Sequence, residues 1–195
     1  MNGAKDTNRA QQVLVAAEAL MTERRSSAIP LADIAERVGV TRSLLYAYYD
    51  GVPAMLDEIF QDHLGLLERA IRPPLEEGAP FRERALAAHL AYLDYLIASG
   101  ESLLLLLRER QQDSPLGETS QRRFRRLLRF VASDTARALA LHPREAFVLL
   151  ELNAAIPEAL ARLVRQGEID RETAVATCAR LIAASLDAFM PIRAG

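Results

Sequence analysis

The sequence predicts an all-α fold of about nine helices. Apolar residues recur at the three- and four-residue spacing of amphipathic helices, and no segment alternates polar and apolar residues as a strand would. Glycines, prolines and capping residues separate these segments, as expected where helices start and stop. With 195 residues, half of them apolar, the chain is long enough to bury a sizeable core.

The first clear motif lies between residues 31 and 55. Residues 31–38 place leucine, isoleucine, alanine and valine on one helical face. Gly39 follows, where the end of a helix favours a residue that accepts positive φ, and Thr41 can cap a new helix. Two short helices joined by a glycine-containing turn form a helix-turn-helix, whose second helix fits the DNA major groove.

This region resembles the TetR-type (tetracycline-repressor-like) transcriptional regulators over about residues 8–64. The matching residues are the alanine-containing stretch 13–21, Ile34-Ala35, Gly39-Val40-Thr41, Leu45-Tyr46 and Tyr49. The resemblance implies an N-terminal three-helix DNA-binding head and a C-terminal helical body that binds a ligand and dimerises. It implies a head over residues 1–51 and a body over 52–195.

Beyond the head, loop-forming residues divide the chain into further helices. The predicted segments are 52–72, stopped by Pro73-Pro74, then 81–99, 101–112, 118–140 and 144–166. Pro157 is expected to kink or break the 144–166 segment. Asp170 is expected to cap the last helix, which ends at Met190-Pro191.

The second short helix carries the predicted DNA contacts. Arg42 can donate two hydrogen bonds to guanine, Ser43 is a small donor and acceptor, and Leu44 can meet a thymine methyl group. Arg9, near the start of the first helix, can add to a local positive surface. The alternative for Arg42 is a solvated surface arginine.

The resemblance assigns roles to four more residues of this region. It implies that Thr41, Tyr46 and Tyr48 contact phosphates, while Leu45 and Tyr49 pack inward. Tyr46 and Tyr48 could instead cover a small core.

The charge of the head favours a competing hypothesis. Residues 1–64 hold six basic and nine acidic residues, a net charge of −3. The resemblance implies a lysine at the start of the fourth helix, where this chain has Val52. Both features favour a helical protein-interaction module that keeps the fold without sequence-specific DNA binding, and they predict modest non-specific affinity for DNA.

A ligand pocket is expected in the body. Polar tips lie among apolar side chains on the 81–99 segment, a mixture typical of small-molecule pockets. The candidate lining residues are His89, Tyr92, Leu93, Leu96, Arg108 and Asn153. Taken alone, each residue fits a place in the core better than one in a pocket, and Asn153 could instead fix the register of an interface.

The last two long helices carry apolar stripes at helical spacing, and such stripes can be core or interface. The resemblance favours an interface, because family members pair through these helices as a four-helix bundle. The candidate interface residues are Ile156, Leu160, Cys178, Leu181, Ile182, Ser185 and Phe189.

One further cluster stands apart from these assignments. Arg122, Arg125, Arg126 and Arg129 share one helical face and, with Arg123, form the densest positive patch in the chain. Such a patch can bind an acidic partner or an anionic ligand, or it can be a solvated face.

Motifs for catalysis, metal binding and membrane insertion are missing from the sequence. There is no HExxH, GxSxG, P-loop or GxGxxG pattern, and the three histidines are isolated. The longest apolar run, residues 44–49, is far shorter than a membrane span of about 20 residues. We therefore expect a cytoplasmic protein that is not an enzyme and holds neither metal nor cofactor.

The combined prediction is a transcriptional regulator, more specifically a repressor. It would bind a pseudo-palindromic DNA operator as a homodimer and be released by a small-molecule effector.

Overall fold

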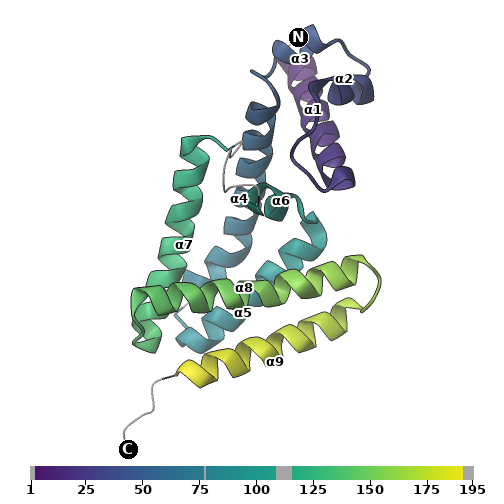
Figure 1. Cartoon of the computed structure of the whole chain (residues 1–195). Coiled ribbons are helices and arrows are strands. Elements are labelled where there is room, and N and C mark those ends of the chain that lie inside the picture. The colour runs from purple at the N-terminus through teal and green to yellow at the C-terminus, as the bar shows by residue number, and fades with distance from the viewer. Residues whose placement is uncertain (1–2, 77, 109–115, 191–195) are drawn as a thin grey trace, which may run out of the picture. The chain divides into compact units, whose positions relative to one another are not determined.

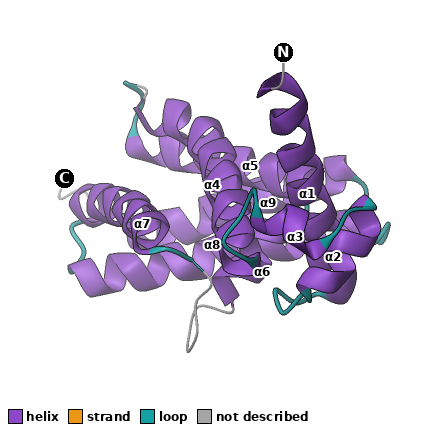
Figure 2. Ribbon diagram, turned by 90° about the horizontal axis from the view of Figure 1, so that it is seen from above, coloured by secondary structure: helices purple, strands orange, loops and turns teal. Residues whose placement is uncertain are grey.

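The computed structural model describes residues 3–76, 78–108 and 116–190, with the side chains of residues 3–7 left out. In this part of the chain every regular element is a helix, as Figures 1 and 2 show. In chain order they are α1 (Gly3–Arg24), α2 (Leu31–Val38), α3 (Arg42–Tyr46), α4 (Val52–Glu76), α5 (Phe81–Ser99), α6 (Ser102–Arg108), α7 (Glu118–Leu139), α8 (Pro143–Arg165) and α9 (Arg171–Phe189). The prediction of an all-α chain of about nine helices is confirmed for these residues.

The predictions for α8 and α6 need correction and restriction, respectively. Pro157 neither breaks α8 nor ends it, because the helix continues from Pro143 to Arg165 around this buried proline. The helix predicted over 101–112 begins at Ser102 and is described to Arg108, and residues 109–112 lie outside the described part.

The predicted end of the 52–72 helix was wrong, because α4 continues through Pro73 and Pro74 to Glu76. Proline removes an N–H donor, so the carbonyls four residues earlier lose their helical partners. Its φ near −65° is nevertheless helical, so a final turn can form. Arg84 stabilises that turn by donating to the carbonyl of Leu75, which lies at the open end of the helix.

The helices form two compact units, which are described separately. One unit comprises residues 1–64 with 101–123, and the other comprises residues 65–100 with 124–195. The functional boundary predicted between residues 51 and 52 stays a prediction. Among the described helices none alone is long and apolar enough to span a membrane; α5 and α6 pass that test only when combined across a sharp bend.

The first unit is built on α1. Helix α1 packs against α2 and α6, and α2 packs against α3. The fully buried side chains of this unit include Val13, Ala17, Met21, Ile34, Leu45, Met55 and Phe60. Two surface ion pairs join the end of α1 to α2, namely Arg37 with Glu23 at 2.6 Å and Arg24 with Asp33.

A polar cluster inside the first unit joins three helices. The Glu18 carboxylate on α1 accepts a hydrogen bond from Nε2 of His63 on α4 at 2.7 Å, and another from the Ser102 hydroxyl on α6 at 2.6 Å. His63 and Ser102 are buried. The hydrogen bond from His63 is the main cause that holds the pKa of Glu18 below its usual value, and the Ser102 bond adds to it against the opposing effect of burial.

The second unit is built on α5, α8 and α9, each of which packs against the other two. Its fully buried side chains include Leu93, Leu96, Ala146, Ala161, Ala174, Cys178 and Ile182. The predicted Asp170 cap is confirmed, with its carboxylate accepting from the Thr173 N–H at 2.7 Å. His142 caps α8 together with Glu145.

We predict that Glu18→Gln lowers the free energy of unfolding at pH 7 by about 1–3 kcal/mol, because two hydrogen bonds lose a charged acceptor. Since folding lowers the pKa of Glu18 from about 4.5, its contribution is complete above pH 4.5 and is lost as the pH falls through the lowered pKa. The difference between wild type and variant should therefore shrink below pH 4.5. Urea denaturation at a series of pH values measures this difference in the free energy of unfolding.

Glu36→Gln is the matched control, because Glu36 is exposed on α2 of the same unit. Equal destabilisation by the two substitutions would contradict a specific role for Glu18.

Candidate nucleic-acid interface

The turn between α2 and α3 depends on the backbone of Gly39. Gly39 has φ +71° and ψ 40°, the left-handed conformation that ends α2, and its N–H bonds to the carbonyl of Glu36 at 3.1 Å. No atom lies within 4 Å of the position that a Cβ would occupy. Glycine is therefore favoured here by the backbone conformation and not by lack of space. The predicted helix-turn-helix is present.

Thr41 caps α3 as predicted. Its backbone is extended, and its hydroxyl oxygen accepts a hydrogen bond from the Leu44 N–H at 3.3 Å. The cap matters more than usual because α3 has only five residues and satisfies few of its own N–H groups. The bond leaves the hydroxyl hydrogen of Thr41 as a donor for another partner.

Helix α3 separates an outer face from an inner one. Thr41, Arg42, Ser43 and Leu44 are exposed, whereas Leu45 is fully buried. The outer residues thus form a continuous surface at the start of the helix, which is the part that a recognition helix presents to base edges.

The tyrosines after this surface differ in burial. Tyr46 is 60% exposed, Tyr48 is half-buried and Tyr49 is buried. Burial, with a smaller effect of the neighbouring Glu58 carboxylate, raises the pKa of Tyr49 to about 12, so this phenol stays neutral. Tyr46 can therefore offer its hydroxyl to a partner, while Tyr49 packs inward.

Some arginines of the head form ion pairs with carboxylates, and others do not. Arg37 and Arg24 are held by Glu23 and Asp33. Among the described residues no carboxylate pairs with Arg42, and the exposed Arg9 bonds only weakly to the Gln12 amide at 3.4 Å. Positive charge is thus available at Arg42 and Arg9 although the head as a whole is acidic.

Val52 and Pro53 form the first turn of α4, with Val52 half-buried and Pro53 exposed. Neither side chain is charged. Any anion contact at this helix start would therefore depend on backbone N–H groups, which face outward at the N-terminus of a helix.

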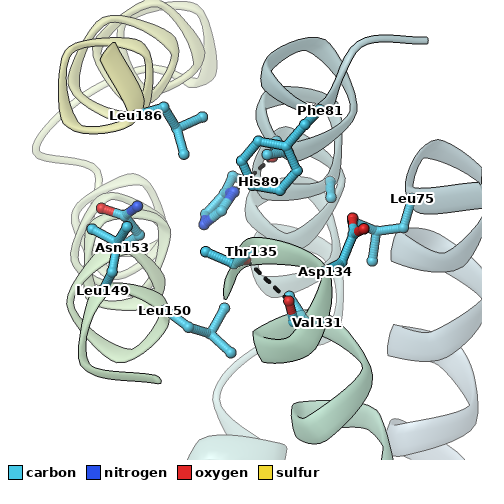
Figure 3. Close-up of a pocket in the computed structure, with 12 residues that line it drawn as sticks. Leu75, Phe81, His89, Val131, Asp134, Thr135, Leu149, Leu150, Asn153 and Leu186 are labelled. Carbon is cyan, nitrogen blue, oxygen red and sulfur yellow. Dashed lines mark hydrogen bonds between the residues drawn. The ribbon is translucent and has the colours of Figure 1, made fainter. Parts of the chain in front are cut away.

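The second unit encloses a cavity of about 30 Å³, shown in Figure 3. His89 and Asn153, two of the predicted pocket residues, line it together with Phe81, Thr135 and Leu186. His89 Nδ1 donates to the carbonyl of Ala85 at 2.7 Å, and burial lowers the pKa of its imidazole, so the ring is neutral at pH 7. A cavity of this volume has room for only one or two water molecules.

The other predicted pocket residues lie elsewhere. Tyr92, Leu93 and Leu96 do not line this cavity, and Arg108 is an exposed residue of the first unit. The hydroxyl of Tyr92 donates to Glu158 at 3.1 Å, and burial, reinforced by this carboxylate, raises the pKa of the phenol. Asn153 Oδ1 accepts from the Ser185 hydroxyl at 2.8 Å, which joins α8 to α9.

The seven predicted interface residues fall on two faces. Leu160, Cys178 and Ile182 are buried within the chain, and burial raises the pKa of the Cys178 thiol to about 11. Leu181 and Phe189 are exposed, and Ile156 and Ser185 are half-buried. The predicted α9 stripe therefore combines core residues with surface residues.

An exposed apolar face on α8 was missed at the sequence level. Val148 and Leu152 are 55% and 65% exposed and lie one helical turn apart. The apolar run 146–150 conceals this face, because four or five consecutive apolar residues do not indicate which of them point outward. No group of three or more potential metal ligands occurs among the described residues.

Comparison with known proteins identifies the fold. No protein-family model matches the chain, and no curated protein matches its sequence. A TetR-like transcriptional regulator from Rhodococcus sp. RHA1 is similar, with 23% identity, coverage of 91% of this chain and 93% of that chain, and a TM-score of 0.69. A TetR family transcription regulator from Marinobacter aquaeolei VT8 has 17% identity, coverage of 95% and 98%, and a TM-score of 0.71.

A protein with unknown function from Rhodococcus sp. RHA1 also matches, with 18% identity, coverage of 90% and 94%, and a TM-score of 0.66. Because the likeness extends over nearly the whole of each chain, the fold is that of TetR-type regulators. The resemblance noted in the sequence is confirmed as a fold.

We predict that Thr41→Val destabilises α3 by about 1 kcal/mol, because the Leu44 N–H loses its side-chain acceptor and keeps only the Thr41 carbonyl at 3.1 Å. Hydrogen exchange followed by NMR should show faster exchange at the Leu44 amide. Thr41→Ser keeps the hydroxyl and should retain the wild-type rate. Equal protection of Leu44 in the Thr41→Val variant would contradict the capping role.

Proposed function

We propose that the chain is a TetR-type transcriptional regulator that binds double-stranded DNA through α3. The observation that carries this proposal is the outer surface of α3, where a capped helix start exposes Arg42, Ser43 and Leu44 with the guanidinium unpaired by any described carboxylate. The fold shared with solved regulators supports it.

Each exposed group has a role in this proposal. Arg42 donates to the O6 and N7 atoms of guanine, Ser43 donates or accepts at a neighbouring base, and Leu44 contacts a thymine methyl group. Thr41, Tyr46 and Tyr48 donate to phosphates, which fixes the position of the helix without selecting a sequence. Arg9 adds a phosphate contact. Because Arg24 and Arg37 are engaged with carboxylates, we expect few phosphate contacts and modest non-specific affinity.

We further propose that the chain acts as a homodimer through α8 and α9. The exposed apolar residues of these helices support this: Phe147, Val148, Leu152, Leu181 and Phe189. Covering such a surface in water is favourable. A dimer would also present two recognition helices about 34 Å apart, which matches successive major grooves of a pseudo-palindromic operator.

The effector part of the proposal is a population shift. A small molecule bound by the body would favour a dimer arrangement whose recognition helices no longer match the operator, with a typical coupling of about 1–3 kcal/mol. Repression would follow where the operator overlaps a promoter. His89 and Asn153 are the predicted pocket residues that border an internal cavity.

A second candidate is a helical interaction module of the same fold without sequence-specific DNA binding. Val52, in the first turn of α4, supplies no charged side chain at a position where the resemblance implies a lysine. The two candidates differ in what the outer surface of α3 should do, and this difference can be measured.

We predict that Arg42→Ala lowers affinity for the preferred sequence by about 1–3 kcal/mol and relaxes selectivity at one base position, since the lost contact is to a base edge. Fluorescence anisotropy with a duplex from the DNA flanking the gene, and with a scrambled duplex, measures both effects. If that duplex is not bound selectively, random-duplex selection supplies the preferred sequence.

Arg9→Ala is the comparison for this experiment. It should weaken binding to both duplexes alike and reduce the salt dependence by about one phosphate contact. If the wild-type protein binds one duplex selectively and Arg42→Ala does not change this selectivity, the proposed role of α3 is contradicted. If the wild-type protein shows no selectivity for any duplex, the interaction module is favoured. A ligand that binds the body should weaken operator binding in the same assay.

We predict that Leu152→Asp and Leu181→Asp convert the dimer into a folded monomer, because each places a charge in an apolar interface. Sedimentation velocity measures the association state, and circular dichroism checks the fold. Val15→Asp is the matched control, since Val15 is an equally exposed apolar residue on α1. A dimer that survives both α8 and α9 substitutions would contradict the proposed interface.

A further inference from the structure

The arginine-rich face of α7 borders an open groove in the second unit, which we call the α7 groove. It has a volume of about 620 Å³. Its walls include Arg84, Arg126, Arg129, Phe130, Ser133 and Arg137, with Leu75, Glu76 and Asp134 completing the lining. Ligand sites for drug-sized molecules typically measure about 300–1,000 Å³, so the α7 groove has the size of a small-molecule site. The internal cavity near His89 is far smaller.

The acidic groups of the α7 groove already have partners. Asp134 forms an ion pair with Arg84 at 3.0 Å, and Glu76 forms one with Arg72 at 2.9 Å. Arg84 also donates to the carbonyls of Leu75 and Ala79, which fixes its guanidinium in the wall. Both carboxylates are therefore engaged with arginines, and Arg84 is itself held by two backbone carbonyls.

Three arginines of the α7 groove have no anionic partner within the described part of the chain. Among the described residues no carboxylate pairs with Arg126, Arg129 or Arg137, and Arg129 donates only to a backbone carbonyl of its own helix, at 3.3 Å. Arg126 and Arg129 are three residues apart, so their side chains are neighbours on the helix, where like charges repel. A bound anion between them would remove this repulsion.

The spacing of the three arginines indicates an elongated ligand. Arg137 lies eight residues beyond Arg129, which corresponds to about 12 Å along a helix. Between them, the Ser133 hydroxyl adds a polar group, and Phe130 presents a ring that is 41% exposed. The Arg72 guanidinium lies 5.8 Å from the centre of this ring and supports it.

We propose that the α7 groove binds a phosphorylated organic molecule of nucleotide size. Arg126 and Arg129 would hold its phosphates, because the planar guanidinium forms paired hydrogen bonds with phosphate oxygens. The organic part would lie against Phe130 and Leu75, and Arg137 would meet a polar group at the far end. Phosphate is favoured over a single carboxylate because it supplies more negative charge and more acceptor oxygens to two adjacent cations.

Isothermal titration calorimetry of the full-length protein tests this proposal with ATP in the absence of divalent cations, and with tripolyphosphate and adenosine as partial probes. ATP should bind saturably at submillimolar concentration, tripolyphosphate more weakly, and adenosine not at all. Arg126→Gln and Arg129→Gln should each weaken ATP binding by at least about tenfold, the effect of losing a charge-assisted hydrogen bond. Phe130→Ala should weaken the binding of ATP and leave that of tripolyphosphate unchanged.

Arg122→Gln is the matched control, because it removes the same charge from an exposed position on the same helix outside the groove lining. It should leave ATP binding within about twofold of wild type, since screened surface charges contribute little. Three results would each overturn the proposal. ATP could fail to bind saturably, Arg122→Gln could weaken ATP binding as much as Arg126→Gln and Arg129→Gln do, or ATP could bind no more tightly than tripolyphosphate. The titration is made without DNA, so its outcome is independent of operator binding.

Discussion

The arrangement of the first unit depends on one half-buried carboxylate. Glu18 lies in the middle of α1, and a carboxylate in that environment is stable only when hydrogen-bond donors satisfy it. Its donors, His63 and Ser102, come 45 and 84 residues later in the chain. Satisfying Glu18 therefore brings α1, α4 and α6 together, and α2 and α3 are positioned in turn because α2 packs on α1 and α3 packs on α2.

The distribution of charge matters more to the proposed function than the net charge. The head is acidic, yet Glu23 and Asp33 are occupied by Arg37 and Arg24, while Arg42 has no described carboxylate beside it. The same pattern recurs in the second unit, where Arg84 and Arg72 pair with the acidic groups of the groove, and three arginines of α7 have no carboxylate partner among the described residues. In both units, a count of charges in the sequence does not show which arginines are paired with carboxylates.

The features predicted correctly from sequence are those that short-range chemistry controls. Gly39 ends α2 because a helix end favours positive φ, and Thr41 starts α3 because its hydroxyl reaches an N–H three residues ahead. The end of α4 was predicted wrongly for the opposite reason: Arg84, which stabilises the turn after Pro73-Pro74, is supplied by a separate helix. Likewise the helical spacing on α9 located an apolar stripe but did not separate buried Ile182 from exposed Leu181.

The sequence by itself determined the all-α class, through the helical spacing of its apolar residues. It also determined most helix ends and the helix-turn-helix, because these follow from the backbone preferences of a few neighbouring residues. Tertiary structure alone decided which arginines are neutralised, which residues of the α8 and α9 stripes are exposed, and which side chains border the cavity and the α7 groove. Those properties arise from contacts between residues far apart in the chain, and the periodicity of one helix carries no information about the surface that packs against it.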